Sequence, residues 1–156
     1  MMKEHNYKAT VKWTGNKGKG TSNYKEFERC HTISIEKKPD ILCSSDPAFR
    51  GDRTKYNPEE LLLSSLSACH MLWYLHLCSE ANVIITEYSD QATGIMNETS
   101  NGSGYFSEVN LNPKTTVTES SMIKKAIELH KKANELCFIA NSVNFKVNHS
   151  PICLVE

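Results

Sequence analysis

The feature that most constrains the fold is an uncharged segment in the middle of the chain. Residues 61–79 contain no Asp, Glu, Lys or Arg over 19 residues. A helix that is apolar on nearly every side must be covered by protein or by lipid. Its length approaches that of a bilayer span, but four serines and two histidines interrupt it, and no Lys or Arg cluster flanks it. We therefore expect a helix buried by protein, not a membrane helix.

The residues before this segment are typical of a helix amino terminus. Asn57 can accept hydrogen bonds from free backbone N–H groups, and Pro58 suits the first helical position. Glu59 and Glu60 place negative charge at the positive end of the helix dipole. The sequence predicts a central helix over residues 57–81.

The amino-terminal third alternates apolar and polar residues. This alternation predicts a β-meander over residues 7–36, with strands near 7–15, 22–27 and 30–36. Residues 37–56 lose this periodicity, so we expect a long functional loop.

The carboxyl-terminal half predicts further strands and a second helix. We expect a β-hairpin over residues 83–118, a helix over 120–137 and a last strand over 142–148. Segregated strands and helices indicate the α+β class, with one domain over residues 1–156.

Charge and composition limit the partners and the location. The chain has 18 basic and 18 acidic residues, so it lacks the positive field of a nucleic-acid-binding protein. The amino terminus lacks the apolar stretch of a secretory signal, and we expect a cytoplasmic protein. In that reducing compartment its six cysteines should mostly be thiols.

Cys69 lies in the middle of the expected helix, where a thiol is normally a packing group. It becomes reactive only if a nearby cation stabilises the thiolate, and the helix dipole fades beyond the first turn. Arg50 and Arg53 in the preceding loop could supply that cation, and Glu59 could hold the arginine. Cys137 could form a disulfide with an oxidised Cys69, or both cysteines could simply pack.

The sequence contains no motif that indicates a metal or a nucleotide cofactor. There is no Cys-x-x-Cys, and Cys69 with His76 falls short of a four-ligand zinc site. No glycine-rich phosphate-binding motif occurs. We expect neither a metal nor a bound cofactor. The remaining cysteines are interpreted as structural thiols: Cys30, Cys43, Cys78 and Cys153.

Together these motifs resemble the OsmC/Ohr family of thiol-dependent peroxidases. The resemblance rests on Asn-Pro-Glu-Glu-Leu-Leu at 57–62, Ser-Ala-Cys at 67–69 and a helix-borne Cys137, and it spans nearly the whole chain. The chain departs from better-known members after Cys137, where Phe-Ile-Ala-Asn-Ser at 138–142 replaces Cys-Pro-x-Ser.

The resemblance implies an OsmC-like fold in an intertwined homodimer, with antiparallel strands wrapped around the central helices. It also implies reduction of organic hydroperoxides in oxidative stress defence. Cys69 would be the peroxidatic nucleophile and Cys137 the resolving thiol. Cys69 would be activated by a pair formed by Glu59 and Arg50, or by Glu59 and Arg53 instead. An external dithiol, characteristically protein-bound lipoyl, would reopen the disulfide.

Two other functions fit the same residues. The chain could form a non-catalytic dimer that binds an apolar ligand, with the cysteines as packing groups. Alternatively, it could be a cysteine-based redox sensor that oxidises readily but turns over poorly.

Overall fold

The computed structural model describes residues 3–156, which divide into two compact units at the Leu61–Leu62 bond. We expected one domain over residues 1–156. The division has a structural basis, because among the described residues the first three strands pair with no strand of residues 62–156.

The first unit contains a three-stranded antiparallel sheet in the order β1-β2-β3. Its strands are β1 (Thr10–Trp13), β2 (His31–Ser34) and β3 (Ile41–Cys43). The strand expected near 22–27 is absent, because Asn23 holds a turn there: its Oδ1 accepts from the N–H of Lys25 and its carbonyl from the N–H of Glu26. The third strand lies instead in the segment predicted as a loop, where Cys43 is fully buried. That segment also contains the short helix η1 (Pro47–Phe49).

The long helix α1 (Pro58–Glu80) begins where the sequence predicts. Asn57 Oδ1 accepts from the N–H of Glu60 at 2.8 Å, and the N–H of Asn57 donates to Glu60 Oε2 at 3.1 Å. These reciprocal bonds form a capping box, which satisfies two otherwise unpaired donors.

Only one stripe of α1 is buried within the chain. It consists of Leu66, His70, Tyr74 and Cys78, at successive intervals of four residues. In the described part of the chain, α1 is the one helix with the length and apolarity of a membrane span, and this stripe packs into the protein core. The opposite side includes Leu72, which is 63% exposed.

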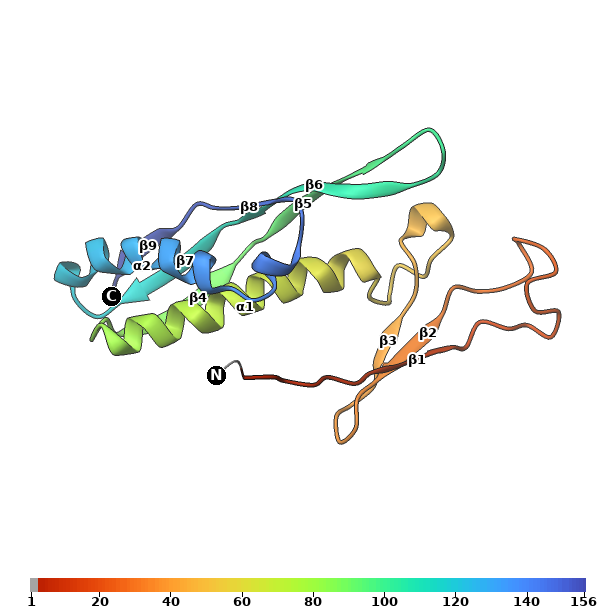
Figure 1. Ribbon diagram of the computed structural model, residues 1–156, viewed down its shortest axis with the longest axis horizontal. Coiled ribbons are helices and arrows are strands. Elements are labelled where there is room, and N and C mark those ends of the chain that lie inside the picture. The colour runs from red at the N-terminus through yellow and green to blue at the C-terminus, as the bar shows by residue number, and fades with distance from the viewer. Residues whose placement is uncertain (1–2) are drawn as a thin grey trace. The chain divides into compact units, whose positions relative to one another are not determined.

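The second unit contains two three-stranded sheets, ordered β4-β7-β9 and β5-β6-β8. The β4/β7 and β5/β6 pairs are antiparallel, whereas β6/β8 and β7/β9 are parallel (Figure 1). The strands are β4 (Ile85–Asp90), β5 (Thr93–Glu98), β6 (Gly104–Leu111), β7 (Pro113–Val117), β8 (Lys146–His149) and β9 (Ile152–Val155).

These strands differ from the simple hairpin expected over 83–118. Asp90 Oδ1 accepts from the N–H of Asn112 at 2.7 Å, at the point where β6 ends and β7 begins in the other sheet. The last strand expected over 142–148 begins later, because η3 (Ala140–Ser142) precedes β8. Pro151 then separates β8 from β9, a strand that the sequence did not predict.

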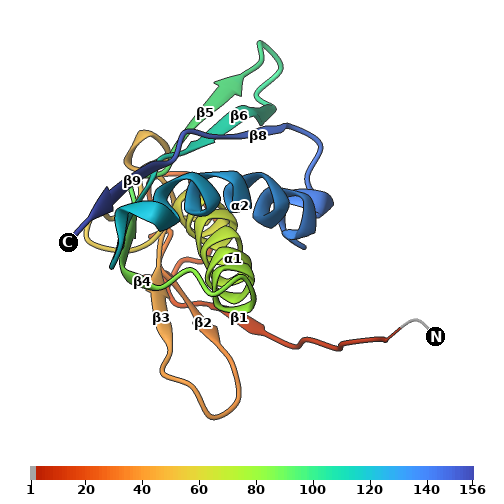
Figure 2. The ribbon, with the colours of Figure 1, turned by 90° about the vertical axis from the view of Figure 1, so that its left-hand side faces the viewer.

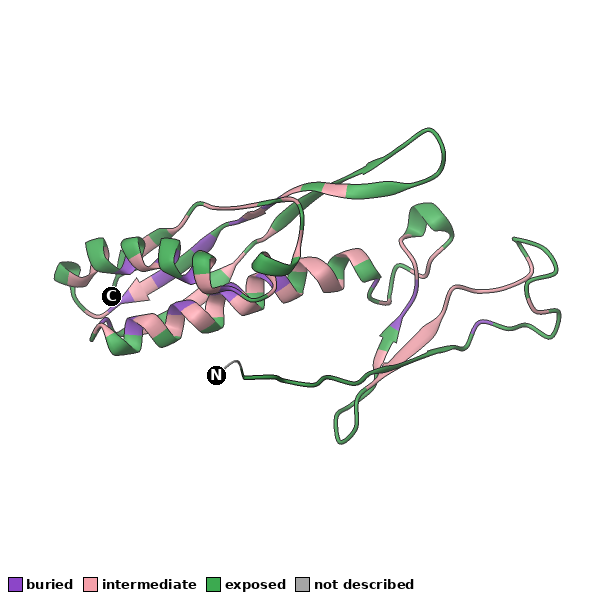
Figure 3. Ribbon diagram, in the orientation of Figure 1, coloured by how far each residue is buried: buried purple, intermediate pink, exposed green. Residues whose placement is uncertain are grey.

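Helix α2 (Ile123–Leu136) follows the short helix η2 (Ser120–Met122) and crosses α1 at an angle, since Figure 2 shows α1 nearly end-on and α2 running across the view. Its buried residues Ala126, His130 and Ala133 share one face. Ala126 and Ala133 of this face join Tyr74 and Cys78 of α1 in a core that also contains Val117 of β7, and Figure 3 marks buried residues on both helices. The predicted α+β class is confirmed.

Candidate functional site

The two cysteines singled out from the sequence are neighbours in the second unit. Cys69 is half-buried on α1, and Cys137 is buried at the carboxyl end of α2. Burial, together with interaction with the Cys69 side chain, raises the pKa of the Cys137 thiol to about 11. Cys137 is therefore a thiol at neutral pH, not a thiolate.

Backbone and aromatic contacts fix the surroundings of the thiol pair. The N–H of Ala140 donates to Cys137 Sγ at 3.4 Å, which partly offsets the effect of burial on its pKa. One turn after Cys69, Trp73 meets Phe138 edge to face, with ring centroids 5.5 Å apart. The segment that replaces Cys-Pro-x-Ser thus contributes both a hydrogen-bond donor and an aromatic contact.

This arrangement suits sequential thiol chemistry. A protonated, buried Cys137 is a poor first nucleophile, whereas the half-buried Cys69 is open to a small oxidant. Two adjacent cysteines on packed helices can then condense into a disulfide.

The other predicted site residues, Arg50 and Glu59, lie in the first unit. Arg50 is exposed at the end of η1 with φ 65°, and its guanidinium carbon lies 5.9 Å from the centre of the Tyr24 ring. The ion pairs within residues 3–156 include neither Arg50 nor Glu59. The Arg–Glu pair over Cys69, and the choice between Arg50 and Arg53, stay predictions.

Sequence reasoning missed a group of buried histidines in the second unit. His70 Nε2 and His130 Nδ1 are 3.0 Å apart, and both side chains are buried. His149 lies with its ring centroid 5.7 Å from that of His70, and Tyr74 stacks on His130 at 3.8 Å. A signal was present, since His70 and Tyr74 are four residues apart on α1 and His130 falls on the apolar face of the second helix.

Burial also lowers the pKa of these histidines. The pKa of His70 falls to about 4 and that of His130 to about 3, and neighbouring imidazoles add to both shifts. The pair is therefore neutral at physiological pH. Among the described residues, no group of three or more His, Cys, Asp or Glu side chains is arranged to hold a metal ion.

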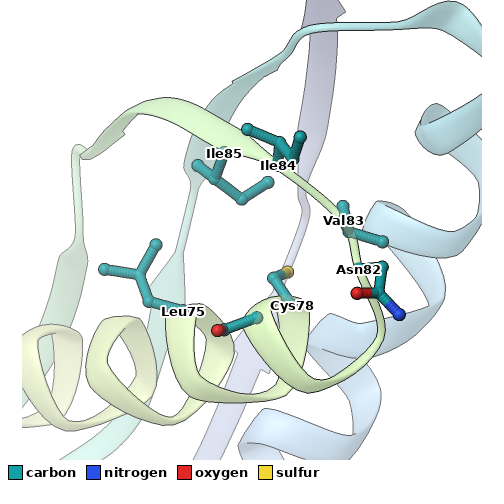
Figure 4. A pocket seen from close by; sticks show the side chains of 7 residues that line it. Leu75, Cys78, Asn82, Val83, Ile84 and Ile85 are labelled. Carbon is teal, nitrogen blue, oxygen red and sulfur yellow. The ribbon is translucent and has the colours of Figure 1, made fainter.

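Two hollows lie beside α1 in the second unit. One, of about 470 Å³, is at the carboxyl end of α1 and is lined mainly by apolar side chains (Figure 4). The other, of about 480 Å³, lies beside the α1 face that carries Ser67, Ala68 and Met71. Neither is lined by Cys69 or Cys137. The residues around the first hollow are Leu75, Cys78, Ser79, Asn82, Val83, Ile84 and Ile85.

The chain is similar to several solved structures over almost its whole length. An OsmC-like protein of unknown function from Vibrio cholerae is 28% identical, with a TM-score of 0.85, and the alignment covers 96% of this chain and all of that one. An OsmC-like protein from Mycoplasma pneumoniae is 17% identical, with a TM-score of 0.72 and coverage of 97% and 99%.

A third structure is an organic hydroperoxide resistance protein from Elizabethkingia anophelis. It is 18% identical, with a TM-score of 0.71 and complete coverage of both chains. These likenesses confirm the predicted OsmC-like fold. No curated protein matches the chain.

The description of the matching family model is "OsmC-like protein", and the match covers residues 51–150. That region contains α1, α2 and both cysteines of the thiol pair. The chain therefore belongs to the OsmC-like protein family.

Proposed function

We propose that the protein is a two-cysteine peroxidase that reduces organic hydroperoxides to alcohols. The observation that supports this most is the juxtaposition of Cys69 and Cys137 on α1 and α2. Membership of the OsmC-like family and the likeness to an organic hydroperoxide resistance protein are consistent with a peroxide-related role.

The proposed reaction has three steps. The Cys69 thiolate attacks the distal oxygen of the hydroperoxide, and the O–O bond breaks to give a Cys69 sulfenic acid and an alkoxide that takes a proton. The Cys137 sulfur then attacks the Cys69 sulfur, forming the disulfide and releasing water. An external dithiol finally reduces the disulfide and becomes a disulfide itself.

The second step requires Cys137 to lose its proton. Burial opposes this loss, whereas the N–H of Ala140 directed at Cys137 Sγ supports it. We propose that this backbone donor promotes proton loss from Cys137 in a chain that lacks the Cys-Pro-x-Ser segment.

The first step requires a positive charge beside Cys69. We propose that Arg50 supplies it and that Glu59 orients the guanidinium, with Arg53 as the alternative. One observation supports a role for Glu59. Its Oε2 atom is buried and has no hydrogen-bond partner among residues 3–156, so it is available to accept from an arginine.

We also propose an intertwined homodimer in the cytoplasm, with a dithiol protein, possessing a lipoyl group, as reductant. The dimer is supported by the incomplete coverage of α1 within one chain, where Leu72 remains 63% exposed. The α1 helix of a second copy is also apolar, so it could cover the exposed side of α1 without any charged residue in the contact.

A turnover assay tests the proposed function. Consumption of cumene hydroperoxide with dihydrolipoamide as reductant should be fast in the wild type and lost in Cys69→Ser and in Cys137→Ser. Hydrogen peroxide serves as the comparison oxidant and should react more slowly. Cys153→Ser is the matched control, because Cys153 is a half-buried thiol of the same unit outside the pair. Equal turnover in wild type and Cys69→Ser would refute the proposal.

The hollow in Figure 4 favours a second candidate function, the binding of an apolar ligand. Its volume of about 470 Å³ and its Leu, Ile and Val lining suit a small hydrocarbon group. This function predicts thermal stabilisation by a fatty acid without peroxide consumption. Val83→Asp should abolish that stabilisation. A redox sensor would instead oxidise at Cys69 and turn over poorly with any dithiol.

A further inference from the structure

The buried histidines connect three elements of the second unit. His70 comes from α1, His130 from α2 and His149 from the end of β8. The rings of His70 and His130 are nearly parallel, at 6°, and Tyr74 stacks on His130 with an interplanar angle of 11°. The His70–His130 pair is thus a central contact between the two helices.

Only two of the four ring nitrogens of this pair have a hydrogen-bond partner among the described residues. One imidazole donates to the other through the 3.0 Å contact between His70 Nε2 and His130 Nδ1. The two outer nitrogens, His70 Nδ1 and His130 Nε2, are buried without a partner within residues 3–156. In either tautomer, one of them is an unpaired donor and the other an unpaired acceptor. An arriving proton would therefore create a further buried N–H group without an acceptor.

Among the described residues, no carboxylate lies within ion-pair distance of either imidazole to stabilise that proton. The ion pairs among the described residues include neither His70 nor His130. A second charge on the partner imidazole would add repulsion at this distance. The titratable groups around the pair are His149 of β8 and Tyr74 of α1, with Tyr88 of β4 and the thiols of Cys78 and Cys153 next to Tyr74.

The same helix contact carries the thiol pair. His70 directly follows Cys69, and His130 lies seven residues before Cys137, on the same face of α2. A movement of α2 away from α1 that separates the two imidazoles therefore also moves Cys137 relative to Cys69.

We propose that His70 and His130 form an acid-sensitive latch, which positions Cys137 against Cys69 while both imidazoles are neutral and releases α2 from α1 when one imidazole is protonated. The latch regulates the proposed thiol site, and in that sense it rests on the proposed function. Its physical behaviour does not depend on peroxide reactivity and can be measured separately.

Hydrogen exchange of the α2 amides tests the latch. An imidazole that titrates near 6.5 when released and at about 4 when latched makes release about 30-fold more favourable at pH 5.0 than at pH 7.5. After correction for intrinsic exchange rates, protection of α2 should fall by this factor in the wild type. Amides of the β5–β6 hairpin should lose much less protection.

The matched variant is the double substitution His70→Gln and His130→Asn. Its amide groups can replace the bond between Nε2 and Nδ1 but cannot take up a proton in this pH range. The pH-dependent loss of α2 protection should disappear in this variant. It should persist in His76→Gln, because His76 lies on the exposed side of α1.

The thiols provide a second readout. Labelling with 4,4′-dithiodipyridine followed by peptide mapping gives the rate at which Cys137 closes the disulfide on a labelled Cys69. The pH dependence of the thiol itself is the same in both proteins, so it cancels when the wild-type rate is divided by the rate of the double variant. This ratio of rates should fall as the pH is lowered.

Three results would overturn the latch. They are unchanged α2 protection at pH 5.0, an equal loss in α2 and in the β5–β6 hairpin, and a double variant that keeps the wild-type pH dependence. The first two are measured in the wild type alone, so the test stands even if the double variant does not fold. Absence of peroxide turnover would refute the proposed function and leave these measurements unaffected.

Discussion

Leu72→Ala offers a direct test of the proposed contact between two copies of α1. Leu72 is 63% exposed within the chain. Full burial of a leucine side chain contributes about 1.5–3 kcal/mol, so covering this exposed fraction contributes about 1–2 kcal/mol per copy. A symmetric dimer contains the contact twice. The substitution should therefore weaken the dimer by about 2–4 kcal/mol, or roughly 30- to 1,000-fold in Kd.

Sedimentation equilibrium over a range of protein concentrations measures this change. Leu66→Ala is the matched control, because Leu66 lies on the same helix but is fully buried within its own chain. It should lower the unfolding free energy of each protomer by about 3 kcal/mol, through lost contacts and a residual cavity. An unchanged dimer Kd in Leu72→Ala would refute the assignment of this face to the second copy.

Three further predictions follow from the structure. Asn57→Ala removes one half of the capping box and should lower stability by about 1 kcal/mol, measured by urea unfolding. Burial lowers the pKa of His70 to about 4, so the stability that depends on a neutral His70 is complete above pH 6.5 and is lost as the pH falls toward 4. The unfolding free energy should therefore drop by about 3 kcal/mol over that range. The drop should be smaller in His70→Gln. In Cys137→Ser, one equivalent of cumene hydroperoxide should leave a Cys69 sulfenic acid that dimedone traps, whereas adduct formation at another cysteine instead would contradict the assignment.

The start of α1 could be predicted from the sequence because its determinants are local. Asn57, Pro58 and the two glutamates satisfy the first turn without help from distant residues, and the capping box forms as expected. The same holds for α2, whose apolar residues recur on one face.

The sheets were less predictable because their pairing is not local. β8 and β9 pair in parallel with β6 and β7, from which they are separated by α2, and no turn signal specifies such a register. β3 is a three-residue strand whose burial of Cys43 depends on β2. Length and alternation alone could not separate it from a loop.

The candidate site was also predictable only in part. The sequence pattern singled out Cys69 and Cys137, but only the fold shows them as neighbours and shows that burial keeps Cys137 protonated. The histidine pair escaped prediction because His70 and His130 are 60 residues apart in the chain. A histidine on an apolar helix face gives no indication of its partner.

The central claim is that Cys69 and Cys137 form one redox unit. Reduced protein treated with one equivalent of cumene hydroperoxide and analysed by intact mass and peptide mapping tests it most directly. The account predicts the loss of two hydrogen atoms per chain and a bond that joins Cys69 to Cys137. An unchanged mass with both thiols free, or a disulfide between other cysteines, would contradict it.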